Sequence, residues 1–237
     1  MEELITVENL SFCYPDGQQA LTDVNLTIYQ GGSVALIGPN GAGKSTLLFH
    51  FNGILRSNGR VKLLGRPLNE HNLRWARSKV GLVFQNPDDQ LFSPTVFDDV
   101  AFGPINMGYS EAEVHRAVTR ALDLVGMSGY EKRSPHHLSV GEKKRIAIAT
   151  VLSMSPAILI IDEPTSNLDP RGKWSLIDVL KRLPGTKIIV SHDLELVKAL
   201  CQRVVIIDQG RVVADSAADD ILADQRLLAA HGLAPAE

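Results

Sequence analysis

The sequence contains few cysteines, few aromatic residues and no long apolar run. Its 237 residues include two cysteines, Cys13 and Cys201, whose separation fits neither a disulfide framework nor a metal site. We therefore expect a reducing compartment and interpret both cysteines as small buried hydrophobic residues. The longest apolar runs, such as AILII at 157–161, have the length of a strand. None approaches the roughly 20 residues of a membrane span.

A strong charge and a targeting signal are lacking as well. The net charge of −3 argues against nucleic-acid binding by bulk attraction, and we expect no nucleic-acid partner. The N-terminus, MEELITVENL, is acidic and does not show the pattern of a signal peptide. We expect a cytosolic protein. If it works at a membrane, it does so peripherally at the cytoplasmic face, and another chain supplies the spans.

The apolar pattern predicts an α/β fold. Residues 22–28, TDVNLTI, alternate apolar and polar side chains, as in a strand with one wet face. Five later runs are almost entirely apolar, as in a parallel sheet covered on both faces. These runs are VALI (34–37), VGLVF (80–84), AILII (157–161), KIIV (187–190) and VVII (204–207). Helical stretches lie between several of them, so we predict a mainly parallel core preceded by an antiparallel β part.

Residues 86–156 carry no convincing strand and are predicted to be a helical subdomain inserted into one domain of residues 1–237. The core then comprises residues 1–85 and 157–237. The clearest helix begins after Ser110, where Glu113 completes a capping box, and ends near Gly126. The tail, SAADDILADQRLLAAHGLAPAE, is predicted to be a short helix with a loose end.

A phosphate loop follows the apolar run at 34–37. The sequence GPNGAGKST matches G-x-x-x-x-G-K-[ST]. Glycines allow backbone N–H groups to wrap phosphate oxygens, Lys44 can reach the β- and γ-phosphates, and Ser45 can ligate Mg²⁺. The alternative is a glycine turn with a solvated lysine, which the strand–loop–helix context disfavours. The residues predicted to bind ATP here are Gly38, Pro39, Asn40, Gly41, Ala42, Gly43, Lys44, Ser45 and Thr46.

Polar residues follow three further predicted strands. Asp162 and Glu163 follow AILII, Gln85 follows VGLVF, and His192 lies two residues beyond KIIV. Ligands of open α/β sheets bind at the carboxyl ends of the strands, so these residues should surround the phosphate loop. We predict that Asp162, Gln85 and Ser45 hold Mg²⁺, and Gln85 is also a candidate catalytic residue because its neutral side chain could reach the water instead. Glu163 would polarise the attacking water and His192 would hydrogen-bond the γ-phosphate. Each residue alone would more often be structural, and an acidic pair often caps a helix.

These motifs, in this order, resemble the nucleotide-binding subunit of an ATP-binding cassette (ABC) transporter. The resemblance covers nearly the whole chain and includes GPNGAGKST, Gln85, LSVGE at 138–142, ILIIDEPTSNLD at 158–169 and SHD at 191–193. It implies that Tyr14 stacks on adenine, that Glu163 is the catalytic carboxylate and that His192 is the switch histidine. It also implies that residues 166–169 form a loop that communicates across a dimer.

The resemblance further implies a head-to-tail homodimer with two ATP sites. In such a dimer the LSVGE segment of one subunit closes over the ATP of the other, so Ser139, Gly141, Glu142 and Asp169 would contact the partner's nucleotide. A helix N-terminus is suited to an arriving γ-phosphate, although LSVGE alone would be read as a capped surface helix. Val140 stands where the family usually has a second glycine, and we expect its side chain to point away from the phosphate.

The segment after Gln85 resembles the energy-coupling-factor (ECF) importers, especially the cobalt-transport ATPase CbiO and its nickel and biotin relatives. In QNPDDQLFSPTVFDDVAFGP, acidic residues lie beside apolar and aromatic ones. We predict a docking groove near residues 86–102 for arginine-bearing helices of a transmembrane T component, with a separate membrane subunit that binds the substrate. The alternative is a solvated loop over a small core cluster.

The predicted function is an ATP-hydrolysing motor for uptake of Co²⁺ or Ni²⁺. Biotin or another vitamin is the alternative cargo. A soluble ABC ATPase acting on DNA or ribosomes is disfavoured, since neither a long coiled coil nor a second cassette is evident. A nucleotide-binding regulator without turnover is a third possibility. The short tail favours a homodimer over a heterodimer.

Overall fold

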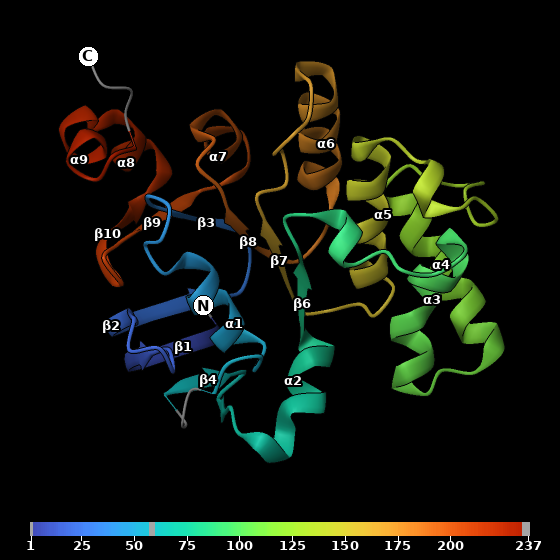
Figure 1. Cartoon of the computed structure of the whole chain (residues 1–237), viewed down its shortest axis with the longest axis horizontal. Helices are drawn as coiled ribbons and strands as arrows, with labels where there is room; N and C mark the ends of the chain where they lie inside the picture. The colour runs from blue at the N-terminus through green and yellow to red at the C-terminus, as the bar shows by residue number, and fades with distance from the viewer. Residues whose placement is uncertain (1, 57–59, 234–237) are drawn as a thin grey trace.

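Two β-sheets and the helices around them make up the computed structural model, which describes residues 2–56 and 60–233 (Figure 1). The larger sheet has the strand order β10-β9-β3-β8-β7-β6, and the smaller sheet has the order β2-β1-β4-β5. The non-consecutive neighbours in the larger sheet require crossover connections, which the helices provide.

Five mainly buried apolar strands and one largely exposed edge strand form the larger sheet. They are β3 (Ser33–Ile37), β6 (Val80–Val83), β7 (Ile158–Asp162), β8 (Thr186–Val190), β9 (Arg203–Asp208) and β10 (Arg211–Ala217). All neighbouring pairs from β9 to β6 are parallel, and β10 pairs antiparallel with β9 at one edge. The five solid apolar runs lie in five of these strands, as predicted. Their parallel alignment brings their carboxyl ends to one edge of the sheet.

The smaller sheet is antiparallel and covers one face of the larger sheet. It consists of β1 (Glu3–Cys13), β2 (Gln19–Tyr29), β4 (Val61–Leu63) and β5 (Arg66–Pro67). The alternating residues 22–28 lie in β2, with Val24, Leu26 and Ile28 buried. Helix α1 (Lys44–Phe51) packs in the same core cluster as strands of both sheets. The predicted α/β fold with an N-terminal antiparallel part is therefore confirmed.

Helices cover the other face of the larger sheet. In chain order they begin with η2 (Pro87–Asp89), α3 (Val96–Met107), α4 (Glu111–Leu124), η3 (Pro135–His137) and α5 (Val140–Leu152). Residues 86–156, all of which the structure describes, contain no strand. Figure 1 shows α3, α4 and α5 grouped together at one side of the molecule. Their buried side chains share one core cluster with β6 and β7.

The capping box predicted for α4 is present. The carboxylate of Glu113 accepts hydrogen bonds from the Ser110 N–H at 2.8 Å and from the Ser110 hydroxyl at 2.7 Å. Val114 and Val118 are buried on the inner face of the helix. Gly126, just beyond the end of the helix, has a φ of 69°, which glycine adopts without strain.

The remaining helices are η1 (Glu70–Asn72), α2 (Leu73–Lys79), α6 (Pro170–Arg182), α7 (Leu194–Leu200), α8 (Ala218–Ala223) and α9 (Gln225–Ala230). The tail thus forms two short helices where one was predicted, and the predicted loose end falls on residues 234–237, outside the described residues. Within residues 2–56 and 60–233, no helix is long and apolar enough to cross a membrane.

The prediction that both cysteines are buried is wrong for one of them. Cys201 is buried, but Cys13 is exposed at the end of β1. The β1–β2 pairing shifts register between Leu10 and Phe12 and again between Phe12 and Cys13. Such irregularities change the face to which a side chain points, so the alternation of the strand does not reach its end.

Candidate active site

The phosphate loop joins β3 to α1 through positions that only glycine fits. Gly38 has a φ of 153°, and a Cβ atom there would lie 1.9 Å from the carbonyl oxygen of Ile207. Gly43 has a φ of 100°, and its Cβ would lie 2.5 Å from the carbonyl oxygen of Ala20. Both distances are far inside van der Waals contact. The glycines of GPNGAGKST therefore let the loop pass close to neighbouring backbone.

Lys44 is held inside the loop. Its Nζ donates to the carbonyl oxygens of Gly38 and Pro39, at 2.8 Å in each case. Burial lowers the pKa of Lys44, while the carboxylates of Glu163 and Asp162 act in the opposite direction. The loop thus presents a partly desolvated cation beside two carboxylates, a setting in which a phosphate interacts more strongly than it would in water.

The end of β7 faces the start of α1. The Ser45 hydroxyl donates to Oδ2 of Asp162 at 3.4 Å. Burial raises the pKa of Asp162, and the neighbouring Glu163 raises it further. Hydroxyl and carboxylate oxygens are ligands that Mg²⁺ prefers, and a divalent cation would relieve the repulsion between the two carboxylates. These residues therefore fit the predicted magnesium site.

Glu163 is fixed by the residues that follow β8. Its Oε2 accepts from the Ser191 hydroxyl at 3.1 Å, and its Oε1 accepts from the His192 N–H at 3.1 Å and lies 2.8 Å from His192 Nδ1. The Glu163 side chain is 12% exposed, whereas that of His192 is 71% exposed. Glu163 also has a φ of 45°, an uncommon value for a residue other than glycine. The acid is held rigidly, and the histidine reaches toward solvent.

One cavity of about 360 Å³ collects the residues predicted for the nucleotide. Tyr14 lies at its side, where its hydroxyl shares a hydrogen bond of 3.0 Å with the Thr46 hydroxyl. Phe12 contacts the Tyr14 ring edge-on, with the ring centroids 5.0 Å apart. The lining residues are Tyr14, Gln18, Ala20, Asn40, Gly41, Ala42, Gly43, Lys44, Ser45, Thr46, Gln85, Asp162, Glu163 and His192. The sequence motifs thus converge on one cavity. Gln18 and Ala20 were not predicted, whereas Gly38 and Pro39 were predicted to bind ATP but do not line it.

Four further predicted residues lie in a different hollow, of about 500 Å³, that shares no lining residue with the first. Ser139, Gly141, Glu142 and Asp169 all line it. Ser139 caps α5, and Asp169 caps α6 by accepting from the Gly172 N–H at 2.6 Å. Two helix N-termini therefore open on this hollow, and each can attract an anion.

Glu142 closes the N-terminus of α5. Its Oε2 accepts from the N–H and the hydroxyl of Ser139, both at 2.8 Å, and its Oε1 accepts from the Tyr130 hydroxyl at 2.8 Å. The hydrogen bonds from Ser139 contribute most to lowering the pKa of Glu142. An ionised carboxylate only accepts hydrogen bonds, so this side chain suits a hydroxyl of the nucleotide and not its phosphates. Val140 is 45% exposed beside it.

Lys144 is a residue of this region that the motifs did not single out. It is 5% exposed, and its Nζ donates to the carbonyl oxygens of Gln85 at 3.1 Å and Glu163 at 3.0 Å. A signal was present in the sequence, because Lys144 lies on the same helical face as Ile148 and Val151, at spacings of four and seven residues. A lysine at an apolar position of a helix indicates a buried partner.

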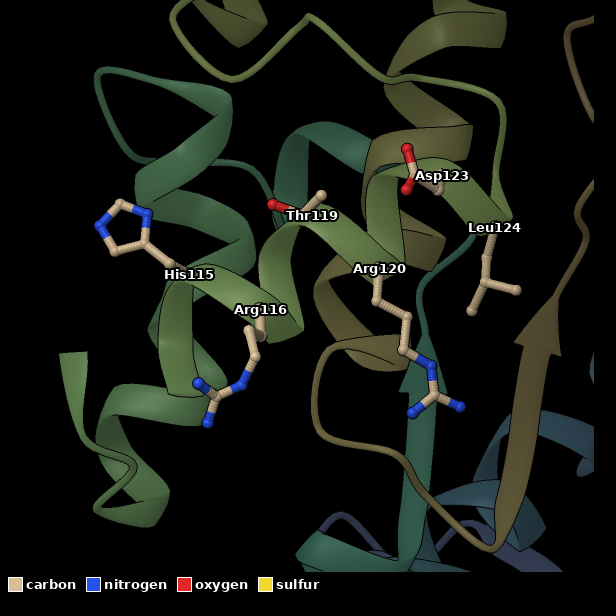
Figure 2. A pocket seen from close by; sticks show the side chains of 6 residues that line it. All are labelled: His115, Arg116, Thr119, Arg120, Asp123 and Leu124. Carbon is tan, nitrogen blue, oxygen red and sulfur yellow. The ribbon is translucent and has the colours of Figure 1, made fainter. Parts of the chain in front are cut away.

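A further hollow lies on the outer surface of α4 and does not have the character of a site. Figure 2 shows that His115, Arg116 and Arg120 are spread along a single helix, with both arginines extending downward and His115 to one side, so they do not converge on one point. The polar groups of a binding site converge, so we interpret this hollow as a solvated helix surface.

Comparison with known proteins places the chain in a family. Residues 21–166 match the family described as "ABC transporter". The energy-coupling factor transporter ATP-binding protein EcfA from Methanothermobacter thermautotrophicus is 48% identical over 231 residues, which cover 95% of this chain and 74% of that protein.

Solved structures agree with this placement. CbiO1 from Clostridium perfringens, part of the ABC transporter complex CbiONQ, has a TM-score of 0.86 and 38% identity, and the match covers 99% of this chain and 96% of that chain. A dimeric ATP-binding cassette in a post-hydrolysis state, bound to ADP and Pi, has a TM-score of 0.78 and 26% identity. That match covers 91% of this chain and 99% of the other.

The family match spans the phosphate loop and the acidic pair at the end of β7, and the cavity between them fits ATP and Mg²⁺. The protein is accordingly an ATP hydrolase that binds ATP together with Mg²⁺. The chain belongs to the ABC transporter family, as an ATP-binding subunit of the energy-coupling-factor type.

Proposed function

We propose that this chain is the motor of an importer that carries Co²⁺ or Ni²⁺ through separate transmembrane subunits, at the cytoplasmic face of the membrane. The observation that carries the proposal is an apolar groove with acidic residues beside β6, at the segment predicted to receive a membrane component. The similarity to CbiO1, which is part of the CbiONQ complex, supports the same role.

The groove has a volume of about 720 Å³ and lies between α2, α3 and α5. Phe92 and Phe102 line it at 63% and 53% exposure, with their rings in edge-to-face contact at 5.2 Å. Exposed aromatic side chains at a concave surface are typical of interfaces. Asp89 and Asp99 line the groove together with Arg74 and Arg77. The lining thus carries charges of both signs, and the two aspartates would favour a basic residue on a partner helix.

Asp99 gives the groove a specific contact point. It is 2% exposed, and its Oδ1 accepts from the backbone N–H groups of Phe92 and Ser93 at 3.1 and 2.9 Å. Its Oδ2 is buried and has no hydrogen-bond partner among the described residues. A buried carboxylate oxygen without a partner is costly, and docking of a helix that opens a path to this oxygen would let an arginine satisfy it.

Other residues of the segment 86–102 stabilise the fold. Asp88 pairs with Lys143 at 2.7 Å, and Asp98 accepts from the Thr95 hydroxyl at 2.6 Å at the start of α3. Leu91 is buried. The alternative reading, a loop over a small core cluster, therefore describes these residues, while the aromatic pair and Asp99 remain as the docking surface.

At the ATP site we assign roles from the geometry together with the family resemblance. Glu163 is the general base that orients the attacking water, because it is fixed by Ser191 and His192. His192 contacts the γ-phosphate, Lys44 neutralises it, and Tyr14 stacks on adenine. Ser45, Asp162 and Gln85 would hold Mg²⁺, which would supply positive charge to neutralise the phosphates.

We assign the second hollow to the ATP of a partner copy. The hollow at Ser139 and Asp169 shares no lining residue with the cavity at Lys44, so one chain holds two different half-sites. Head-to-tail pairing of two copies completes both sites at once. Loss of the γ-phosphate after hydrolysis then removes the charge that holds the two halves together.

The cargo is assigned to other subunits. Within residues 2–56 and 60–233, no group of three or more histidine, cysteine, aspartate or glutamate side chains is placed to hold a metal ion. We therefore propose that a separate membrane subunit binds the cation. Biotin or another vitamin is the alternative cargo of the same motor.

Purification of the protein from membranes of its native cell tests this proposal. We expect it to carry transmembrane partners, and we expect uptake of labelled Co²⁺ or Ni²⁺ to need the chain. Phe92→Asp should abolish co-purification, whereas Val213→Asp, at an exposed apolar residue on the edge strand β10, should not. Uptake of biotin alone would refute the cation. Absence of any transmembrane partner would refute the importer and favour a soluble ATPase.

A further inference from the structure

A buried ammonium group lies between the two half-sites of the chain. Lys144 lies on α5, and its Nζ donates three hydrogen bonds: to the carbonyl oxygens of Gln85 and Glu163, at 3.1 and 3.0 Å, and to the Ser166 hydroxyl, at 3.0 Å. The Ser166 hydroxyl itself donates to the Glu163 carbonyl at 2.9 Å. The three protons of the ammonium thus have three acceptors on two separate loops.

The three acceptors belong to functional segments. Gln85 and Glu163 follow β6 and β7, and their side chains line the cavity for the chain's own ATP. Ser166 lies in the loop that leads to Asp169, which lines the other half-site. Lys144 itself contributes to neither cavity. Lys144 therefore holds the backbone of residues near both half-sites, but it is not placed to contact a nucleotide in either of them.

The helix that carries Lys144 connects it to the partner's ATP. Helix α5 begins after its cap Ser139, five residues before Lys144, a rise of about 7.5 Å along a regular helix. A helical segment of this length is stiff, so a displacement of Ser139 by an arriving γ-phosphate also displaces Lys144. The carbonyl oxygens bonded to the ammonium would follow, since a buried cation that loses its acceptors is strongly destabilised.

Burial of the ammonium is otherwise unfavourable. Desolvation lowers the pKa of Lys144 to about 8, although the nearby carboxylates of Glu163 and Asp162 oppose the shift. The buried ammonium therefore depends on its three hydrogen bonds. An apolar side chain of similar length would fill the same volume without this desolvation, so packing alone does not explain a lysine here.

We propose that Lys144 is a positioning residue that couples the two ATP sites of the dimer, by holding the backbone at Gln85 and Glu163 in register with the α5 N-terminus. The inference rests on the head-to-tail pairing described above. Binding of the partner's ATP at Ser139 then sets the geometry of Gln85 and Glu163 at the chain's own ATP. In the dimer, each ATP thus sets the catalytic geometry at the other ATP through the Lys144 of the chain that lies between them.

Lys187 provides a matched control. It is also a buried lysine, at 7% exposure, and its Nζ donates to the carbonyl oxygens of Leu183 and Gly185 at 2.8 and 3.4 Å. It lies near the amino end of β8, at the edge of the sheet opposite the nucleotide. Lys187→Met thus removes a comparable buried ammonium without affecting either half-site.

The test compares Lys144→Met and Lys187→Met in the full-length protein. We expect Lys144→Met to lower kcat on the order of 10–100-fold, the cost of a misplacement of about 1 Å, with ATP affinity unchanged. Lys187→Met should lower the melting temperature with little effect on kcat. Lys144→Gln, whose amide supplies two donors one bond short of the ammonium, should recover part of the rate because it can still hold the carbonyl groups.

Cooperativity of ATP hydrolysis distinguishes coupling of the two ATP sites by Lys144 from structural support of the loops alone. The wild-type protein should hydrolyse ATP with a Hill coefficient above 1, and Lys144→Met should reduce it to 1. The proposal would be overturned if Lys144→Met left kcat unchanged or lowered it only as much as Lys187→Met does. It would also be overturned if the Hill coefficient were 1 in the wild type, or the same in Lys144→Met as in the wild type. If the wild type forms no ATP-dependent dimer, the paired-site function itself fails, which is a separate result.

Discussion

Glu163→Gln tests the assignment of the catalytic base with little change in shape. The carboxylate accepts hydrogen bonds from Ser191 and from the backbone of His192, as described above. An amide fits the same place if its oxygen takes the position of Oε1 and its NH₂ donates to the Ser191 hydroxyl, which can accept. The substitution should therefore preserve the fold and ATP binding while it removes the basic oxygen.

The expected loss of rate follows from general base catalysis. Such a base contributes about 10²–10⁴-fold to turnover. Each factor of ten corresponds to about 1.4 kcal/mol, so we expect Glu163→Gln to raise the activation barrier by about 3–5 kcal/mol. Because binding persists without turnover, the variant should accumulate as an ATP-bound dimer.

Phosphate release at saturating Mg-ATP measures the rate, fluorescent nucleotide titration measures binding, and light scattering measures the dimer. Glu195→Gln is the matched control, since this glutamate has a side chain 75% exposed and pairs with Lys173. It should retain full turnover. Unchanged turnover in Glu163→Gln would refute the assigned base, and so would a loss of rate explained by lost ATP binding.

Three further predictions concern the loop, the second half-site and a cysteine. Gly41→Ala should lower the free energy of unfolding by about 1–2 kcal/mol, because the φ of Gly41 is 79° although there is free space for a Cβ atom. Gly38→Ala should lower it more, because its Cβ would lie 1.9 Å from a carbonyl oxygen. Urea unfolding measures both changes. Val140→Ala should reduce ATPase turnover less than Ser139→Ala, and the reverse ranking would mean that the phase of α5 is wrong. Cys201, whose pKa burial raises to about 12, should resist alkylation at mildly alkaline pH until urea unfolds the chain.

The fold and the first half-site were predictable because their signals are local. A phosphate loop is defined by consecutive residues, and a solid apolar strand ends where polar residues begin. Parallel topology then brings Gln85, Asp162 and His192 to one edge of the sheet, as the cavity lining shows. The sequence pattern is enough to place these residues, because parallel strands bring their carboxyl ends to one edge of the sheet. Their chemical roles remain proposals.

Other features depend on contacts that sequence patterns do not contain. The three acceptors of Lys144 lie on two loops distant from it along the chain, so helical phase shows that it is buried but not what it binds. Whether Cys13 is exposed depends on register shifts in the β1–β2 pair. One hydrogen bond to Glu142 comes from the Tyr130 hydroxyl, which reaches it from the segment after α4. Each required the packed structure.

The central claim is that one chain carries two half-sites that only a second copy completes, and mixing two inactive variants tests it directly. Lys44→Ala disables the phosphate loop. Gly141→Asp places a carboxylate at the second hollow, where a Cβ has only ordinary contact with Leu168 at 3.7 Å. Each variant alone should lack turnover. Mixed dimers contain one complete site, so the mixture should hydrolyse ATP above the sum of the separate variants, at a rate lowered by the lost coupling through Lys144. A mixture no more active than that sum would contradict the claim.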